Sequence, residues 1–151
     1  MYHIPKYKLQ MVREGTHKSS VKNVTDPGEA AQMISEYLGP QYQEHFVIIL
    51  LDVKNRVRGI QTVHIGGLNS SIVEPKSVFK PAIAAGIVAS LIIGHNHPSG
   101  DVTPSQEDIS VTGRLVDAGE ILGIGILDHI VVGEDGRYIS FREKGLIGGI
   151  I

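Results

Sequence analysis

The amino-acid sequence predicts an α/β (α+β) fold in which helices flank a mixed central β-sheet. Apolar residues make up 42% of the 151 positions, which is enough for one hydrophobic core. Short apolar runs, typical of buried strands, alternate along the chain with segments whose apolar residues recur at helical spacing. A hairpin pattern stands at each end of this series, so we expect the sheet to contain both parallel and antiparallel neighbours.

The first predicted helix begins after Asp26. The side chain of Asp26 can cap the helix, Pro27 suits the first helical position, and Glu29 completes a capping box. Apolar residues then recur every three or four positions up to Leu38. The Gly39-Pro40 pair that follows is typical of a helix end.

Two apolar runs predict a β-hairpin after this helix. His45–Val53 is rich in Phe, Val, Ile and Leu, Lys54–Arg56 is a turn, and Val57–Ile65 is the second strand. A second helix is expected over Pro75–Gly86, where apolar residues again share one face. Val88–Gly94 is then predicted to be a buried strand.

The last third of the chain repeats the same order of elements. Thr103 is expected to cap a helix that begins at Pro104 and runs to about Leu122. Gly125–Val132 and Arg137–Phe141 follow as two strands joined by a turn that contains Asp-Gly.

The domain organisation that we expect has three parts. Residues 1–25 are an N-terminal segment with one strand at Lys8–Arg13, residues 26–146 are the domain, and residues 147–151 are an apolar C-terminal tail. Two roles stay open for the tail, which are fraying and contact with a second copy in a homo-oligomer.

Composition excludes several classes of protein. The chain has no cysteine, so it has no disulfide framework and no thiolate zinc site, and any metal must be held by His, Asp or Glu. Its net charge of −2 lacks the basic excess of most nucleic-acid binders. The longest apolar run, near Ile87–Ile93, is too short to span a membrane, and the first residues have no signal-peptide core. We therefore expect a cytoplasmic protein without a membrane partner.

Three residues near the end of the predicted Val88–Gly94 strand can meet at one point. His95 and His97 are two residues apart, so their side chains point to the same side of an extended chain. Asp108 lies on the next helix, which a tight turn can fold back across the strand end. Two imidazoles and one carboxylate, with a fourth position left for water, are the ligand number of a catalytic zinc site. Zinc there would lower the pKa of that water to roughly 7.

A hydrolytic site also needs a general base and a group that stabilises the oxyanion. Glu44 stands directly before the predicted strand that begins at His45, and a carboxylate there could move a proton from the water to a leaving amine. Ser105 lies close to Asp108, and its hydroxyl could donate to the oxyanion of a tetrahedral intermediate.

The complete string His-x-His-Pro, six residues and Ser-x-x-Asp resembles the signature of the JAMM (MPN) metalloprotease domain, the family of metal-dependent deubiquitinating enzymes. The bacterial RadC-like branch is the closer match, over roughly Asp26–Leu146. The matching strings are HNHPSGD, TPSQED, LDHIVVG and YISFREKGL. The resemblance implies the JAMM/MPN architecture, which is cytidine-deaminase-like.

The resemblance also implies a role for each candidate residue. The implied zinc ligands are His95, His97 and Asp108. Ser105 matches the serine that stabilises the oxyanion. The catalytic glutamate of the family lies at the start of the strand after the first helix, where Glu44 stands; Glu36 and Glu74 are the alternatives. Family members usually carry an N-terminal helix-hairpin-helix region as well, so we expect this chain to be either a stand-alone form or a shortened one.

The function implied by the resemblance is that of a zinc-dependent metallopeptidase, which cleaves a peptide or isopeptide bond of an unknown peptide or protein substrate with metal-activated water. One alternative is a protein that acts around DNA, because RadC-like families carry the name DNA repair protein; the acidic balance argues against direct DNA binding. Another alternative is a metal-free scaffold module. A nuclease is the weakest alternative, because only the three letters H-N-H suggest it.

Two further sites have expected roles. Asp128 and His129 lie in an apolar strand, and we expect a buried structural pair there, with orientation of a metal ligand as the alternative. Asn96 should point away from the metal if the strand continues through it.

Overall fold

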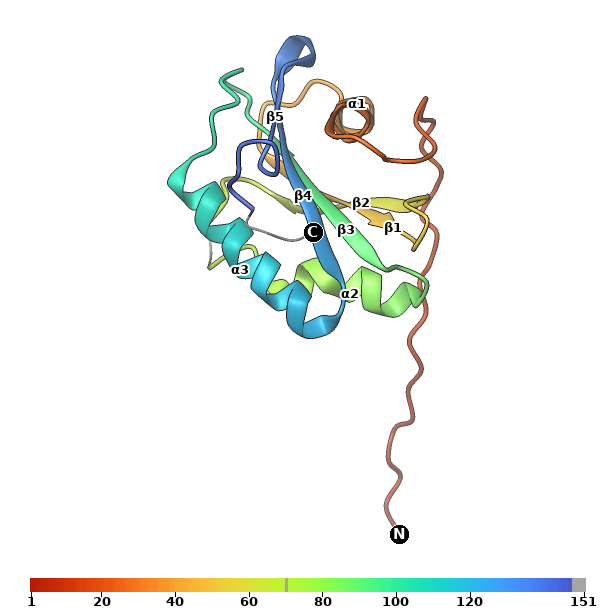
Figure 1. The fold of residues 1–151 in the computed structure, drawn as a ribbon. Coiled ribbons are helices and arrows are strands. Elements are labelled where there is room, and N and C mark those ends of the chain that lie inside the picture. The colour runs from red at the N-terminus through yellow and green to blue at the C-terminus, as the bar shows by residue number, and fades with distance from the viewer. Residues whose placement is uncertain (70, 148–151) are drawn as a thin grey trace.

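In the computed structural model, which describes residues 1–69 and 71–147, five β-strands form one mixed sheet (Figure 1). The strands are β1 (His45–Leu51), β2 (Val57–Ile65), β3 (Ser90–Asn96), β4 (Gly125–Val132) and β5 (Tyr138–Ser140). Their order across the sheet is β2-β1-β3-β4-β5. β3 and β4 are parallel, and the other neighbouring pairs are antiparallel. The α/β fold with a mixed sheet is therefore confirmed.

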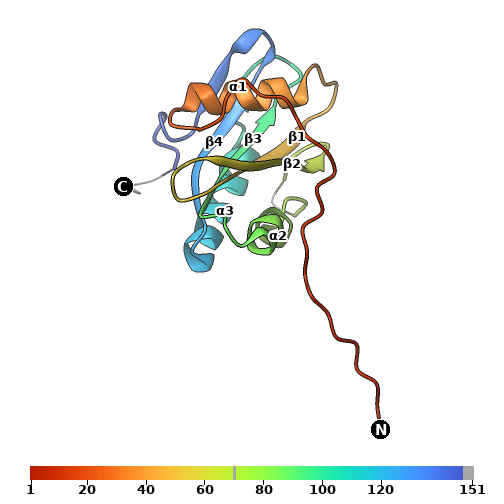
Figure 2. The same ribbon diagram turned by 90° about the vertical axis from the view of Figure 1, so that its right-hand side faces the viewer.

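Helices cover both faces of the sheet. α1 (Pro27–Leu38) lies on one face, and α2 (Pro75–Ala85) and α3 (Gln106–Leu122) lie on the other, as Figures 1 and 2 show. α3 connects β3 to β4, because parallel neighbours need a crossover longer than a tight turn. A short 3₁₀ turn, η1 (Glu134–Gly136), joins β4 to β5.

β1 contributes side chains to the apolar layers on both faces of the sheet. Phe46, Ile48 and Leu50 pack in the layer under α2 and α3, whereas Val47 and Ile49 pack in the layer under α1. All five side chains are buried. A central strand that is covered on both faces has no solvent side, which explains why its sequence is a continuous apolar run.

Two glycines allow helices to approach the sheet closely. A side chain on Gly94 in β3 would collide with Ile34 of α1. A Cβ atom on Gly119 of α3 would lie 2.5 Å from the carbonyl oxygen of Ile124, just before β4. Because real Cβ atoms do not come that near to backbone, these positions set how close α1 and α3 lie to the strands.

The predicted start of α1 is confirmed. The side chain of Asp26 accepts a hydrogen bond from the N–H of Glu29 at 2.9 Å, and the carboxylate of Glu29 accepts one from the N–H of Asp26. Both bonds join residues three positions apart, so they depend on local sequence alone.

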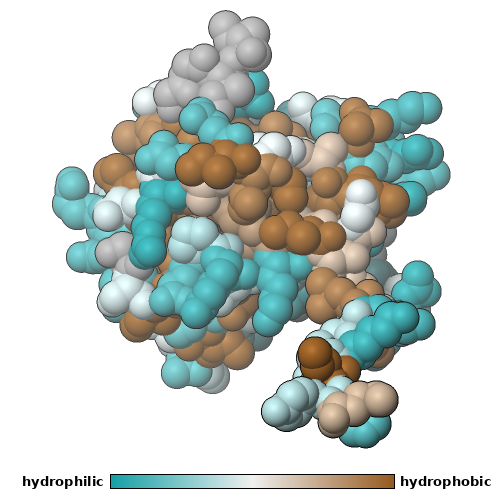
Figure 3. Space-filling view, turned by 90° about the horizontal axis from the view of Figure 1, so that it is seen from below, coloured by the Kyte–Doolittle hydropathy of each residue, from teal (hydrophilic) through white to brown (hydrophobic). Residues whose placement is uncertain are grey.

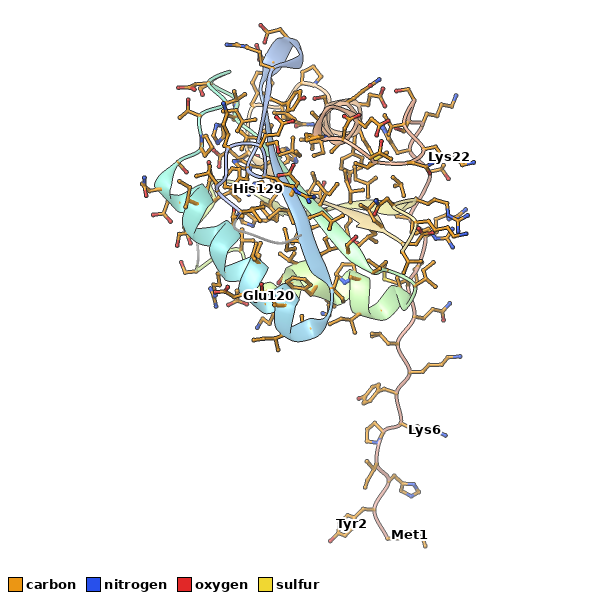
Figure 4. All side chains as sticks on the ribbon, in the orientation of Figure 1. Met1, Tyr2, Lys6, Lys22, Glu120 and His129 are labelled. Carbon is orange, nitrogen blue, oxygen red and sulfur yellow. The ribbon has the colours of Figure 1, made fainter. Side chains whose placement is uncertain are left out.

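The strand expected at Lys8–Arg13 is wrong. The structure shows no regular element there, and Leu9 and Val12 are 68% and 81% exposed. Figure 4 shows the segment around Met1 and Lys6 projecting from the rest of the molecule. A strand needs a paired neighbour to be stable, and no strand of the described residues pairs with this segment.

Seen from below in Figure 3, apolar side chains gather on the face that α2 and α3 cover. Ile83 of α2, Ile121 of α3 and Ile87, just after α2, are each more than half exposed. Of the expected apolar tail, Ile147 is buried in the layer under α2 and α3, and residues 148–151 lie outside the described residues. Within residues 1–69 and 71–147, no helix is long and apolar enough to cross a membrane.

Candidate metal centre

Two elements bring the predicted ligands together. β3 extends two residues past its expected end at Gly94, so His95 belongs to the strand and His97 follows it directly. The N–H of His97 still donates to the carbonyl of Val132 on β4 at 3.0 Å, which keeps the chain extended here. Asp108 lies in the first turn of α3.

The start of α3 differs from the prediction that Thr103 caps it. Ser105 is the N-cap: its hydroxyl oxygen accepts from the N–H of Asp108 at 3.0 Å, and the carboxylate of Asp108 accepts from the N–H of Ser105 at 2.8 Å. Two capping patterns overlap in the sequence, and only the one that starts at Ser105 also turns a carboxylate toward the histidines. Asp108 therefore takes the place that Glu or Gln usually has in a capping box.

His95, His97 and Asp108 form one cluster, called the ligand cluster below. Nε2 of His95 lies 2.9 Å from Nε2 of His97 and 3.2 Å from one carboxylate oxygen of Asp108, and the other carboxylate oxygen lies 3.2 Å from Nε2 of His97. Ligand atoms placed 2.0–2.1 Å from a tetrahedral zinc ion would be about 3.3 Å apart. The spacing and the donor types therefore fit a metal, and among the described residues this is the group that could hold one.

The turn after β3 orients one of the ligands. Nδ1 of His97 lies 2.7 Å from the carbonyl oxygen of Asp101. A carbonyl oxygen only accepts, so Nδ1 carries the proton of the neutral ring and Nε2 presents its lone pair to the cluster. Partners of this kind fix ligand histidines in metalloproteins.

The electrostatics of the cluster favour a bound cation. Burial raises the pKa of Asp108, but the adjacent imidazoles of His95 and His97 lower it by more, and the resulting pKa is far below the usual range. The nearby carboxylate of Asp108 raises the pKa of His97 against the opposing effect of burial. Asp108 is therefore ionised at neutral pH, as a metal ligand must be.

Glu44 lies beside the ligand cluster. Together with His97 and Ser105 it lines an open pocket of about 330 Å³. One carboxylate oxygen of Glu44 accepts from the N–H of Leu68 at 3.2 Å, and its carbonyl accepts from the N–H of Gly66 at 2.8 Å. The loop after β2 therefore holds both the backbone and the carboxylate of Glu44 at the pocket.

The two alternative glutamates lie elsewhere. Glu36 accepts hydrogen bonds from Ser19 and Ser20 and ties the N-terminal segment to α1. Glu74 precedes α2 and pairs with Lys76 at 3.3 Å. Neither residue lines the pocket beside the ligand cluster.

The side chain of Asn96 holds the backbone on both sides of Glu44. Its side-chain oxygen accepts from the N–H of His45 at 2.7 Å, and its amide group donates to the carbonyl of Gln43 at 2.9 Å. These bonds lie on either side of Glu44 in the chain. As predicted, Asn96 points away from the ligand cluster.

The expected structural pair at positions 128 and 129 separates into two roles. Asp128 is structural, because it accepts from the hydroxyl of Ser140 at 2.5 Å. His129, labelled in Figure 4, is fully buried, and its Nε2 lies 2.7 Å from Nδ1 of His95. The expected burial is therefore confirmed for both residues, and the contact with His95 has the geometry of the alternative, in which a metal ligand is oriented. The parallel register, which sets Ile93 of β3 opposite His129 of β4, creates this contact, and local sequence does not encode that register.

Comparisons with known proteins place the chain among its relatives. A family model for the RadC-like JAB domain matches residues 24–146. A UPF0758 protein of Caldanaerobacter subterraneus is 51% identical over 123 residues, which are 82% of this chain and 52% of the relative. One from Shouchella clausii is 52% identical over 127 residues, or 84% of this chain and 54% of the relative. One from Bacillus cereus is 49% identical over 139 residues, or 91% and 60%.

The chain thus spans between about half and three fifths of the length of these curated relatives. The family model covers the whole sheet, all three helices and the ligand cluster. Both the model and the relatives match most of this chain. The chain therefore belongs to the RadC-like JAB domain family.

Proposed function

We propose that this domain is a zinc-dependent hydrolase of the metallopeptidase type, which cleaves a peptide or isopeptide bond. The observation that carries the proposal is the ligand cluster, in which His95 and Asp108 are buried and His97 faces a pocket that Glu44 and Ser105 also line. Two histidines and an aspartate are ligands that zinc accepts, and three protein ligands leave one position for a reacting group. Zinc bound there would polarise the substrate carbonyl and make water more acidic.

The residues around the cluster have matching roles in this proposal. Glu44 takes a proton from the attacking water as the new C–O bond forms, and delivers it to the amine nitrogen as the C–N bond breaks. The products are a carboxylic acid and a free amine, so the atoms balance without a further reactant. The oxygen of Ser105 accepts from the N–H of Asp108, so its own proton is free for the developing oxyanion.

The test measures metal binding and hydrolysis separately. Zinc per chain is determined by elemental mass spectrometry, and cleavage of peptide and isopeptide libraries is followed by mass spectrometry. We expect about one zinc per wild-type chain, and cleavage that Glu44→Gln abolishes while its zinc content stays unchanged.

Glu74→Gln is the matched control, because Glu74 is also half-buried but lies outside the pocket. It should bind zinc and cleave as the wild type does. A wild-type chain that takes up no zinc when zinc is added would overturn the proposal in favour of a scaffold. So would cleavage that persists in Glu44→Gln.

A further inference from the structure

We propose that His129 is a positioning residue of the metal centre. A chain of hydrogen bonds from the backbone of Asp108 through Thr112 and His129 fixes which nitrogen of His95 faces the metal. This inference rests on the metal site of the proposed function, and it is independent of whether the domain cleaves an amide bond.

Thr112 sets the direction of the first bond. Its hydroxyl donates to the carbonyl oxygen of Asp108 at 2.6 Å, one turn back along α3. The same hydroxyl oxygen lies 2.5 Å from Nδ1 of His129. A hydroxyl has a single proton, and here the carbonyl takes it, so Nδ1 of His129 must be the donor in the second bond.

The position of the proton on His129 then determines which group donates in its bond with His95. Its ring is fully buried between Phe46 and Phe141, with ring centroids at 5.8 and 4.4 Å. No carboxylate bonds to it among the described residues, so burial favours the neutral ring. Since Nδ1 holds the proton of the neutral ring, Nε2 is an acceptor. Nδ1 of His95, at 2.7 Å, therefore donates to it.

Both ligand histidines then present the same nitrogen. Nδ1 of His95 is engaged in the core by His129, and Nδ1 of His97 is engaged at the surface by the carbonyl of Asp101. Both Nε2 atoms are left with lone pairs that converge beside Asp108. The only partners of these two Nε2 atoms among the described residues are each other and the carboxylate of Asp108, which are the other members of the ligand cluster.

The network also joins three elements. Thr112 and Asp108 belong to α3, His95 belongs to β3, and His129 belongs to β4. The bonds therefore fix the position of one turn of α3 relative to the two parallel strands, and with it the carboxylate of the third ligand. A residue that only filled space would supply neither the acceptor for His95 nor the donor for Thr112.

The first test compares two variants of His129. His129→Phe keeps an aromatic ring between the phenylalanines but removes the acceptor, whereas His129→Gln places an amide oxygen where Nε2 lies. Zinc dissociation constants are measured by competition with a chromophoric chelator. We expect His129→Phe to bind zinc about 10–100-fold more weakly, and His129→Gln to recover most of the loss. Equal zinc affinity in His129→Phe and wild type would overturn the inference.

A second pair of variants separates positioning from stability. Thr112→Val removes a buried hydroxyl within the network, and Ser140→Ala removes a buried hydroxyl that bonds to Asp128 outside it. Both should lower the melting temperature, but only Thr112→Val should weaken zinc binding. If zinc affinity followed the melting temperature in both variants, the role of the network would be structural only.

Nuclear magnetic resonance of the ring nitrogens tests the assignment without zinc or substrate. We expect His129 to carry its proton on Nδ1 in both the zinc-free and the zinc-loaded chain. A proton on Nε2 would overturn the inference even if the domain proved to be an active hydrolase. Conversely, an absence of cleavage would overturn the proposed function and leave this result standing.

Discussion

Two buried aspartates at opposite ends of β1 and β3 have similar burial and different partners. Asp52 follows β1 and is 6% exposed, and Asp108 lies over the end of β3 and is 2% exposed. In both cases burial raises the pKa, but the neighbouring polar and charged groups lower it by more, so both carboxylates have a pKa below the usual value.

The partners of Asp52 are local. One of its oxygens accepts from the N–H groups of Lys54 and Arg56, and the other accepts from the guanidinium of Arg56 at 3.1 Å. All of these donors lie within four residues of Asp52, and they close the turn between β1 and β2.

Besides the N–H of Ser105, the partners of Asp108 are histidine nitrogens that come from another element. His95 and His97 face it with Nε2 atoms, each of which can present a lone pair because the other ring nitrogen is engaged. A lowered pKa therefore does not by itself mark a functional carboxylate. The kind of partner distinguishes the two, since N–H donors complete a turn whereas converging lone pairs leave room for a cation.

The largest expected effect separates the two aspartates by metal binding. Asp108→Asn should lower zinc affinity by more than the about 10–100-fold that follows loss of an orienting partner, because it changes a ligand itself. Asp52→Asn should keep the wild-type affinity. Zinc at 100 times its dissociation constant should stabilise the wild type and Asp52→Asn by about 2.7 kcal/mol, and Asp108→Asn hardly at all. Thermal unfolding with and without zinc measures this, and equal stabilisation of both variants would exclude Asp108 as a ligand.

A smaller effect concerns the capping box of α3. There Asp108 accepts a hydrogen bond from a nearby backbone N–H, as Asp52 does in its turn. Ser105→Ala removes the cap of α3 and should lower the free energy of unfolding by about 1 kcal/mol, whereas Ser105→Gly should cost only a few tenths. Urea denaturation of the zinc-free chain measures both values.

The same two variants sharpen the proposed role of Ser105 in hydrolysis. Both lack the hydroxyl, so on any substrate that the wild type cleaves, both should lose about 10²–10³ in kcat. If the activity of the two variants followed their stability instead, Ser105→Gly would be nearly as active as the wild type. That result would limit the role of Ser105 to capping the helix.

The smallest expected effect is the pH dependence contributed by Asp52. A carboxyl whose pKa is lower in the folded than in the unfolded chain stabilises the fold when it is ionised. Its contribution is complete above the unfolded pKa of about 3.9 and is lost as pH falls through the folded value. The difference in unfolding free energy between wild type and Asp52→Asn should therefore be constant from pH 7 to about pH 5 and shrink below about pH 4. Urea denaturation without zinc measures it, and a difference that grows on acidification would contradict the assignment.

Local signals in the sequence predicted much of the fold. The capping box at Asp26 and Glu29 needs only four neighbouring residues, and the apolar run of β1 needs only burial on both faces. The spacing of His95, His97 and Asp108 also carries local information, because a strand end and the first turn of the next helix place them. The structure brings these three side chains together as the spacing suggests.

The errors arose where distant residues decide the outcome. Lys8–Arg13 has the composition of a strand, but no strand of the described residues pairs with it. Thr103 and Ser105 both begin acceptable capping patterns, and contact between Asp108 and the histidines accompanies the second. The contact between His129 and His95, which the sequence left as an alternative, likewise depends on the register between β3 and β4, which pairs residues more than thirty positions apart.

Successive side chains at the end of β3 point to opposite sides of the strand. The metal ligands and the residue that anchors Glu44 therefore depend on the same short stretch of sequence. His95 and His97 reach the ligand cluster, and Asn96 between them holds Gln43 and His45, the two neighbours of Glu44. Inserting or deleting one residue before His95 would exchange the two faces of the strand end. Both the metal site and the anchor of Glu44 would then be lost in one step. Point substitutions can alter either part by itself, but changes in the length of β3 must preserve both.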